Sequence, residues 1–142
     1  MSRDAGKVEE RLWYYRIKTT GSQQFINITP HVAEAVRNSQ VQEGIAVVYV
    51  PHTTAGVTIN ENADPDVVRD ILAALEKTYP VRGDYRHGEG NAHAHIKASL
   101  MGSSCTVIIS GGRLLLGTWQ GVFFCEFDGP RNREFYVKIL EG

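Results

Sequence analysis

Hydrophobic and polar residues alternate along several short stretches of the chain, which is the pattern of half-buried strands. In the first of these stretches, Trp13, Tyr15 and Ile17 fall on one face. Ile45–Val50 is apolar on both faces, so we expect it in the interior of a sheet. The expected strands are Leu12–Lys18, Gln24–Ile28, Ile45–Val50, Gly56–Glu61, Cys105–Ile109, Leu114–Gln120, Val122–Phe127 and Glu134–Leu140.

Two proline-containing stretches predict the starts of helices. Thr29-Pro30 combines a hydroxyl cap with proline at the first helical position, and this helix is expected to run to about Val41. Asp64-Pro65 repeats the pattern and is followed by an apolar stripe at helical spacing. A short third helix is expected over roughly Ala92–Leu100, with Asn91 as its cap.

The expected fold follows from the length of the connections. Short strands with tight turns indicate antiparallel pairing, because parallel strands need a crossover of about a dozen residues. We therefore expect a β-rich α+β fold, with an antiparallel sandwich-like sheet core and two or three helices packed outside. The 142 residues contain no repeat or linker-like segment, so 1–142 is expected to form one domain, with 1–8 frayed.

Composition restricts the possible binding partners and the cellular location of the protein. A formal net charge of −1 argues against binding to nucleic acid or to an anionic membrane surface. No apolar run approaches membrane-spanning length, and the N-terminus lacks the apolar core of a signal peptide. Cys105 and Cys125 lie in apolar runs without CxxC spacing, so we expect buried thiols. These features favour a cytoplasmic protein.

A cluster of histidines is the strongest chemical feature. His87, His93 and His95 are three of the five histidines, and imidazole is a common ligand for zinc. If the segment is helical, Asn91 and His95 share a face and His93 points away. If it is extended, His93 and His95 share a face. In either case the local geometry does not complete a metal site, and the natural candidates for a further ligand are His87 from the loop and His52, which follows an interior strand.

Several other residues have both a chemical and a structural interpretation. The alternation places Glu61 on the core-facing side of its strand, where a carboxylate needs a partner. Asp64 is more simply explained as a helix cap. Gly102-Ser103 is either an anion site or a helix C-cap. Gly117–Gly121 marks either the close approach of another backbone or a ligand, or an adjustment of the sheet for core packing. Asp128–Arg133 is either a hairpin turn or a phosphate clamp.

Four stretches together closely resemble the YjbQ family, whose members are often labelled secondary thiamine-phosphate synthase enzymes. The resemblance spans about Trp13 to Ile139. It is carried by His52–Asp66, Gly90–Ser99, Gly112–Gln120 and Glu126–Arg131.

The resemblance implies a homotrimer with a polar, histidine-lined pocket that holds a metal ion close to a subunit interface. It also implies weak thiamine phosphate synthase activity, which joins a pyrimidine diphosphate to a thiazole phosphate and expels pyrophosphate. The residue patterns and the resemblance together give three expected sets: metal ligands His52, His87 and His95; catalytic residues Glu61, Asp64 and His93; and substrate-binding residues Thr54, Asn91, Ser103, Trp119, Gln120 and Arg131.

The expected function is therefore that of a metal-binding enzyme acting on a small phosphorylated molecule. The metal is expected to be divalent, zinc first and magnesium as the alternative. Few basic residues lie near the histidines in the sequence, which fits a side activity better than a dedicated synthase. The alternatives are a metal-dependent hydrolase of a small phosphorylated molecule and a non-catalytic trimer that binds a metal or an anion.

Overall fold

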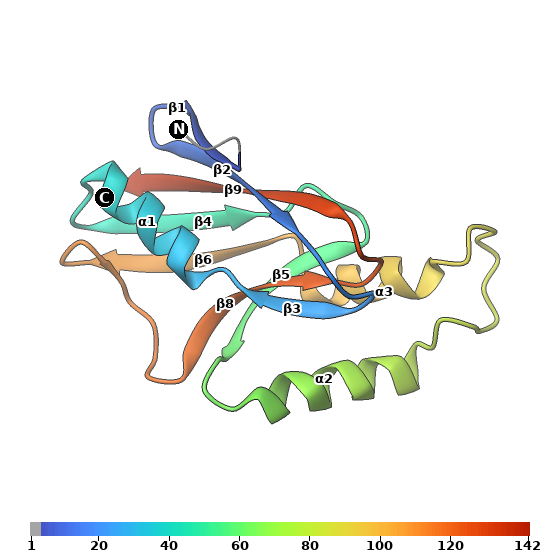
Figure 1. Cartoon of the computed structure of the whole chain (residues 1–142). Coiled ribbons are helices and arrows are strands. Elements are labelled where there is room, and N and C mark those ends of the chain that lie inside the picture. Colours follow the sequence, from blue (N-terminus) through green and yellow to red (C-terminus); the bar gives the residue numbers. More distant parts are fainter. Residues whose placement is uncertain (1–3) are drawn as a thin grey trace.

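The computed structural model describes residues 4–142, and within them it has three helices and two antiparallel sheets (Figure 1). The larger sheet has the order β1-β2-β9-β4-β6-β7 and the smaller one β3-β8-β5. The strands are β1 (Ala5–Glu9), β2 (Leu12–Lys18), β3 (Gln24–Asn27), β4 (Gly44–Tyr49), β5 (Ala55–Glu61), β6 (Ser104–Ser110), β7 (Arg113–Leu114), β8 (Gln120–Glu126) and β9 (Asn132–Glu141). The helices are α1 (Thr29–Ser39), α2 (Pro65–Thr78) and α3 (Ala92–Met101).

The main core lies between the two sheets and α1. Tyr15, Val48 and Phe135 from the larger sheet pack in one cluster with Phe124 from β8 and Val32 from α1. Alternation along the strands produces this cluster, because every second side chain of an antiparallel strand points to the same face. The α+β, β-rich fold expected from the sequence is confirmed.

The N-terminal segment differs from the expectation. Fraying was predicted for residues 1–8, but Ala5–Glu9 forms an edge strand that pairs with β2. Backbone pairing does not require an apolar side-chain pattern, so this strand gave no signal in the sequence. Residues 1–3 lie outside the described part of the chain.

The expected strand Leu114–Gln120 is largely wrong. Strand pairing ends at Leu114, and the chain then leaves the larger sheet before β8 begins at Gln120. Gly117 and Gln120 form the turn: the Gly117 N–H donates to Gln120 Oε1 at 2.8 Å, and the Gln120 N–H donates to the Gly117 carbonyl at 3.1 Å. A side chain at Gly121 would collide with Asn62, so this glycine permits a close approach of two segments.

The helix caps follow the sequence at α2 but not at the other two helices. Asp64 Oδ1 accepts a hydrogen bond from Asp66 N–H at 2.9 Å, which confirms Asp64 as the cap. Thr29 is the first residue of α1 rather than its cap, because its hydroxyl accepts the Val122 N–H at 2.8 Å. Asn91 occupies the N-cap position of α3 without a capping hydrogen bond from its side chain.

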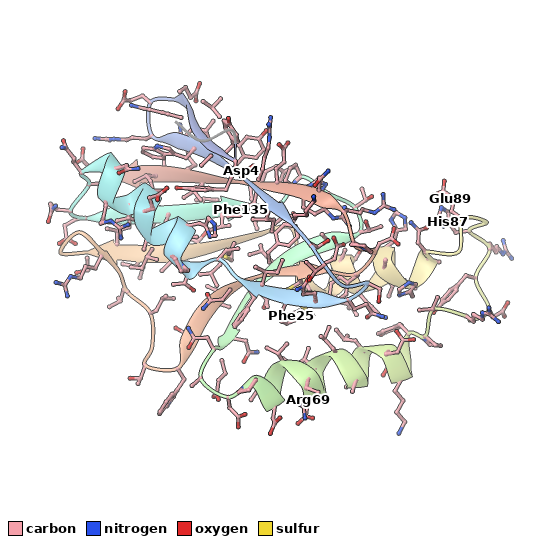
Figure 2. The ribbon with its side chains drawn as sticks, viewed as in Figure 1. Asp4, Phe25, Arg69, His87, Glu89 and Phe135 are labelled. Carbon is pink, nitrogen blue, oxygen red and sulfur yellow. The ribbon has the colours of Figure 1, made fainter. Side chains whose placement is uncertain are left out.

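Helix α2 is attached to the rest of the fold by an apolar stripe and by polar contacts at one residue, Glu76. Its apolar stripe, including Leu72, packs on a second cluster that contains Phe25 and Phe127, yet no residue of α2 is fully buried. Figure 2 shows Phe25 on the side of β3 that faces α2. Glu76 Oε1 of α2 accepts two hydrogen bonds, one from Gln23 Nε2 at 2.7 Å and one from Lys97 Nζ at 2.9 Å. Lys97 comes from α3 and is fully buried.

The two cysteines are free thiols within the described residues; Cys125 is buried as expected, whereas Cys105 is only half-buried. Burial raises the pKa of the Cys105 thiol to about 11 and raises that of Cys125 as well, so neither is a reactive thiolate near neutral pH. Within residues 4–142, no helix is long and apolar enough to span a membrane.

Candidate functional site

A hollow of about 520 Å³ lies where the chain passes from β4 to β5 and faces one side of α3. His52 and His95 both line it, together with the hydroxyl-bearing residues Ser99 and Ser103. His87 reaches His95 from the loop before α3, and the two ring centres are 5.2 Å apart. Figure 2 shows His87 on this loop, at the end of the molecule that carries α3.

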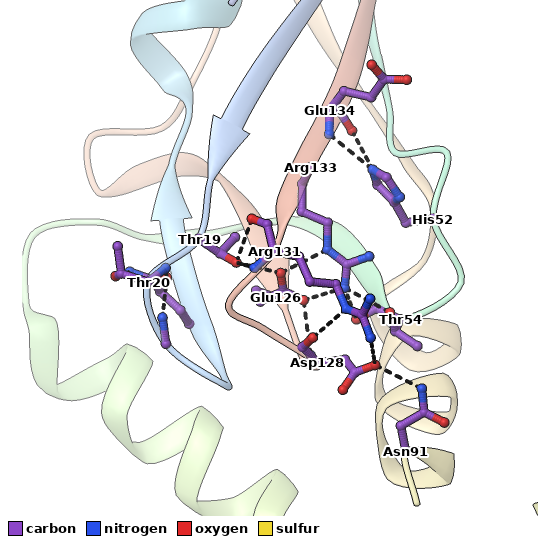
Figure 3. Close-up of polar contacts among 12 residues, drawn as sticks. Thr19, Thr20, His52, Thr54, Asn91, Glu126, Asp128, Arg131, Arg133 and Glu134 are labelled. Carbon is purple, nitrogen blue, oxygen red and sulfur yellow. Dashed lines mark hydrogen bonds and ion pairs between the residues drawn. The ribbon is translucent and has the colours of Figure 1, made fainter. Parts of the chain in front are cut away.

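His52 is held by the backbone of β9. Its Nε2 lies 3.1 Å from both the carbonyl oxygen and the nitrogen of Glu134 (Figure 3). Burial lowers the pKa of His52, and the nearby Arg133 lowers it further, so the neutral ring is favoured. In the tautomer that donates Nε2–H to the Glu134 carbonyl, Nδ1 keeps a free lone pair. A backbone carbonyl that orients an imidazole in this way is a common arrangement at metal sites.

His93 lies on a different side of α3 from His95. It is buried, and its Nδ1 lies 3.1 Å from Lys97 Nζ, which donates to it. Burial and the charge of Lys97 lower its pKa. The helical alternative considered for this segment is therefore correct, and within the described residues no contact joins His93 to the hollow of His52 and His95. Its geometry fits an interior structural role rather than proton transfer in that hollow.

Asn91 and Arg131 are joined through Asp128. Asn91 Nδ2 donates to Asp128 Oδ2 at 2.8 Å, and Arg131 donates to the same oxygen at 2.9 Å (Figure 3). Burial opposes ionisation of Asp128, but these hydrogen bonds outweigh it and lower its pKa. Asn91 Oδ1 is buried without a partner in the described residues, so it is an acceptor available at the start of α3. Arg131 is thus part of a turn, as one interpretation of Asp128–Arg133 expected.

Thr54 belongs to a buried ion-pair network beneath the hollow. Arg133 Nε donates to Glu126 Oε1 at 2.8 Å, and Arg133 Nη2 donates to Thr54 Oγ1 at 2.8 Å. Glu126 also accepts the hydroxyl of Thr19 at 2.8 Å, so each acceptor oxygen has partners. The network holds the residue before β5 against the end of β8, close in sequence to His52. Thr54 therefore has a structural partner rather than an exposed hydroxyl for a substrate.

A second hollow of about 600 Å³ lies on the other side of His52, and sequence analysis missed it. Arg16, Lys18, Asn132 and Arg133 line it, along with the acids Asp4 and Glu134. The register of β2 against β9 creates it by placing Arg16 opposite Glu134 and Lys18 opposite Asn132. The alternation in Leu12–Lys18 already placed both basic residues on the outer face, but the sequence does not reveal the partner strand.

Four expected site residues lie elsewhere. Glu61 and Gln120 are paired at the far end of β5 from His52. A seven-residue strand is about 20 Å long, so Glu61 does not reach the histidines within one chain. Glu61 is half-exposed rather than core-facing, and it lines a smaller hollow of about 250 Å³ with Asp64. Trp119, next to this end of β5, is 62% exposed.

The donor set suits zinc in part. In a tetrahedral zinc site with Zn–N distances of about 2.0–2.1 Å, two imidazole ring centres lie roughly 5 Å apart. The rings of His87 and His95 have this separation, at 5.2 Å. Residues 4–142 of one chain do not, however, bring three or more His, Cys, Asp or Glu side chains together as a metal-binding group. The separation of these two rings is compatible with two zinc ligands, and a third would have to come from His52 after a movement or from outside the chain.

Comparison with known proteins gives the family. The family model described as UPF0047 protein YjbQ-like matches residues 14–142. UPF0047 protein MJ1081 of Methanocaldococcus jannaschii is 56% identical over 133 residues, which cover 94% of this chain and 96% of that protein. UPF0047 protein YugU of Bacillus subtilis is 51% identical over 126 residues, covering 88% and 96%.

Solved structures of related proteins share this fold. A YjbQ/UPF0047 protein from Clostridium acetobutylicum superposes with a TM-score of 0.89 at 63% identity, over 89% of this chain and 98% of that one. A YbjQ-like protein of unknown function from Sulfolobus solfataricus gives 0.88 at 30% identity, over 92% and 96%. The chain therefore belongs to the YjbQ/UPF0047 family.

Proposed function

We propose that this protein is a metal-binding enzyme that acts on a small phosphorylated molecule, with thiamine phosphate synthesis as a weak side activity. The observation that carries the proposal is the pairing of His87 with His95 beside a hollow that His52 also lines. Imidazole donors favour zinc over magnesium, which prefers oxygen ligands. A bound zinc ion would act as a Lewis acid that stabilises negative charge on a phosphate oxygen.

The basic hollow beside His52 supports the choice of a phosphorylated substrate. Arg16 and Lys18 line this hollow together with His52, although both are distant from it in the sequence. Their charge-assisted hydrogen bonds suit phosphate oxygens. Glu134 and Asp4 share the hollow and limit its net positive charge, which fits modest affinity and a side activity. Hydrolysis of a phosphorylated molecule would use the same residues.

We further propose a homotrimer in which a neighbouring subunit completes the site. The outer face of the larger sheet exposes Ile108 and Leu140, which flank Ile45 on the adjacent strand. A contiguous apolar patch of this kind is typical of a subunit interface. Because Glu61 and the exposed Trp119 are remote from the histidines of their own chain, they are candidates to face the histidines of another.

The metal is tested by elemental analysis of the protein purified without chelator. Wild type should contain zinc, and both His87→Ala and His95→Ala should lose it, whereas Arg69→Gln on the exposed face of α2 should retain it. Zinc in all four proteins would show that His87 and His95 are not its ligands. Zinc in none of them would show that the protein does not bind zinc.

Catalysis is tested separately by pyrophosphate release from the pyrimidine diphosphate and thiazole phosphate pair. Activity should fall at least about tenfold in Glu61→Gln with zinc still bound, since removing a group that moves a proton typically costs this much or more. Unchanged turnover in that variant would favour a non-catalytic binding protein.

A further inference from the structure

Another hollow, of about 550 Å³, is lined by the C-terminal end of α1 and by the turn between β6 and β7. Both elements lie at the end of the molecule opposite the histidine loop (Figure 1). Val36 and Val41 are buried and form its floor together with the half-buried Leu114. Its volume falls within the range of about 300–1,000 Å³ that is usual for sites of small molecules.

The rim of this hollow is polar and free of acids. Arg37 and Gln40 come from α1 and its end, Gln42 follows, and Arg113 comes from β7. In the part of the chain that the structure describes, none of these four side chains makes a hydrogen bond or an ion pair. No carboxylate is among the residues that line the hollow. The arginines beside His52 differ, because Arg16 and Arg133 are each paired with a glutamate.

The turn between β6 and β7 fixes the two sides of the hollow relative to each other. The Gly112 N–H donates to the Gln42 carbonyl at 2.9 Å, and the Gly111 N–H donates to Glu43 Oε1 at 3.1 Å. Gly112 has a φ of +75°, and a Cβ there would lie 3.0 Å from the Gln42 side chain. The nearby carboxylate of Glu43 thus accepts a hydrogen bond from the turn, and Arg37 and Arg113 line the hollow from different elements.

We propose that this hollow binds a small molecule that carries a carboxylate or phosphate group on a compact apolar body. Two arginines without internal partners offer paired N–H donors that match the oxygens of such a group. The amides of Gln40 and Gln42 add neutral donors, and the valine floor removes apolar surface of the ligand from water. The site is at the opposite end of the fold from the histidines and does not depend on the proposed function.

The test uses phenyl phosphate as the charged probe and phenol as its uncharged counterpart, with binding followed by titration calorimetry on the full-length protein. Wild type should bind phenyl phosphate with a Kd near or below about 1 mM. Arg37→Gln and Arg113→Gln should each raise this Kd by about tenfold. Both arginines are exposed, so these variants are expected to fold. Arg69→Gln removes an exposed arginine from α2 and should leave the Kd unchanged.

Three results would overturn the proposal. The first is the absence of saturable binding by wild type, including the case in which subunit assembly covers the hollow. The second is an equal loss of affinity in Arg69→Gln, which would indicate unspecific attraction by charge. The third is equal affinity for phenol, which would leave the arginines without a role.

Discussion

Glu76 and Lys97 form an asymmetric ion pair, and this asymmetry gives a sharp prediction about stability. The side chain of Lys97 has no exposed surface, whereas that of Glu76 is 40% exposed. Lys97 Nζ donates to Gln23 Oε1 at 3.0 Å and to His93 Nδ1 at 3.1 Å in addition to Glu76. In Glu76→Gln, the buried ammonium of Lys97 would keep only neutral hydrogen-bond acceptors. Lys97→Met would instead leave a carboxylate that water already reaches.

The expected magnitudes differ by a factor of about three. Breaking a buried pair by removing one partner costs about 3–5 kcal/mol, and the partial exposure of this pair places Glu76→Gln near the lower limit, at about 3 kcal/mol. Methionine fills the volume of the lysine stem, so Lys97→Met should cost about 1 kcal/mol. With about 3 °C per kcal/mol for a chain of this length, Tm should fall by roughly 9 °C and 3 °C.

Thermal and urea unfolding followed by circular dichroism, at one fixed protein concentration, measure both effects. The double variant should resemble Lys97→Met alone, because the buried charge is then absent. Glu10→Gln, which removes a carboxylate from an exposed pair with Lys7, should change stability by less than about 0.5 kcal/mol. If Lys97→Met proves as destabilising as Glu76→Gln, the argument from the buried ammonium is wrong.

Three further predictions concern pH, assembly and the second buried ion pair. Hydrogen bonds from Gln23 and then Lys97 lower the pKa of Glu76 from 4.5 to about 2. The stability that ionised Glu76 adds should therefore be complete above pH 4.5 and be lost progressively as the pH falls toward 2, as measured by unfolding at a series of acid pH values. Mixed assemblies of inactive His95→Ala and Glu61→Gln chains should regain about a quarter of the synthase activity if subunits share the site, and none if each chain has its own. Arg133→Met should lower Tm by roughly 10 °C in thermal unfolding, because the Glu126 carboxylate is fully buried; a fall below about 3 °C would contradict this.

The candidate site was predictable where the signal was local. The cap at Asp64 and the helical alternative for residues 92–100 both follow from neighbours in the chain, and the latter already separates His93 from His95. The proximity of His87 and His95 also follows from their short separation in sequence. Glu61 does not lie beside the histidines of its own chain, and a family motif does not specify whether its residues meet within one chain.

Local sequence patterns were enough to predict the strands with strict alternation, the amphipathic helix α2 and the β-rich α+β class, since each depends on periodicity over a few residues. Three features became visible only in the folded chain: β1 pairs with β2, the chain leaves the larger sheet after Leu115, and β9 places Arg16 and Lys18 beside His52. These outcomes depend on strand pairing between segments that lie far apart in the chain. Pairing of this kind is determined by burial and register over the whole fold rather than by local residue preference.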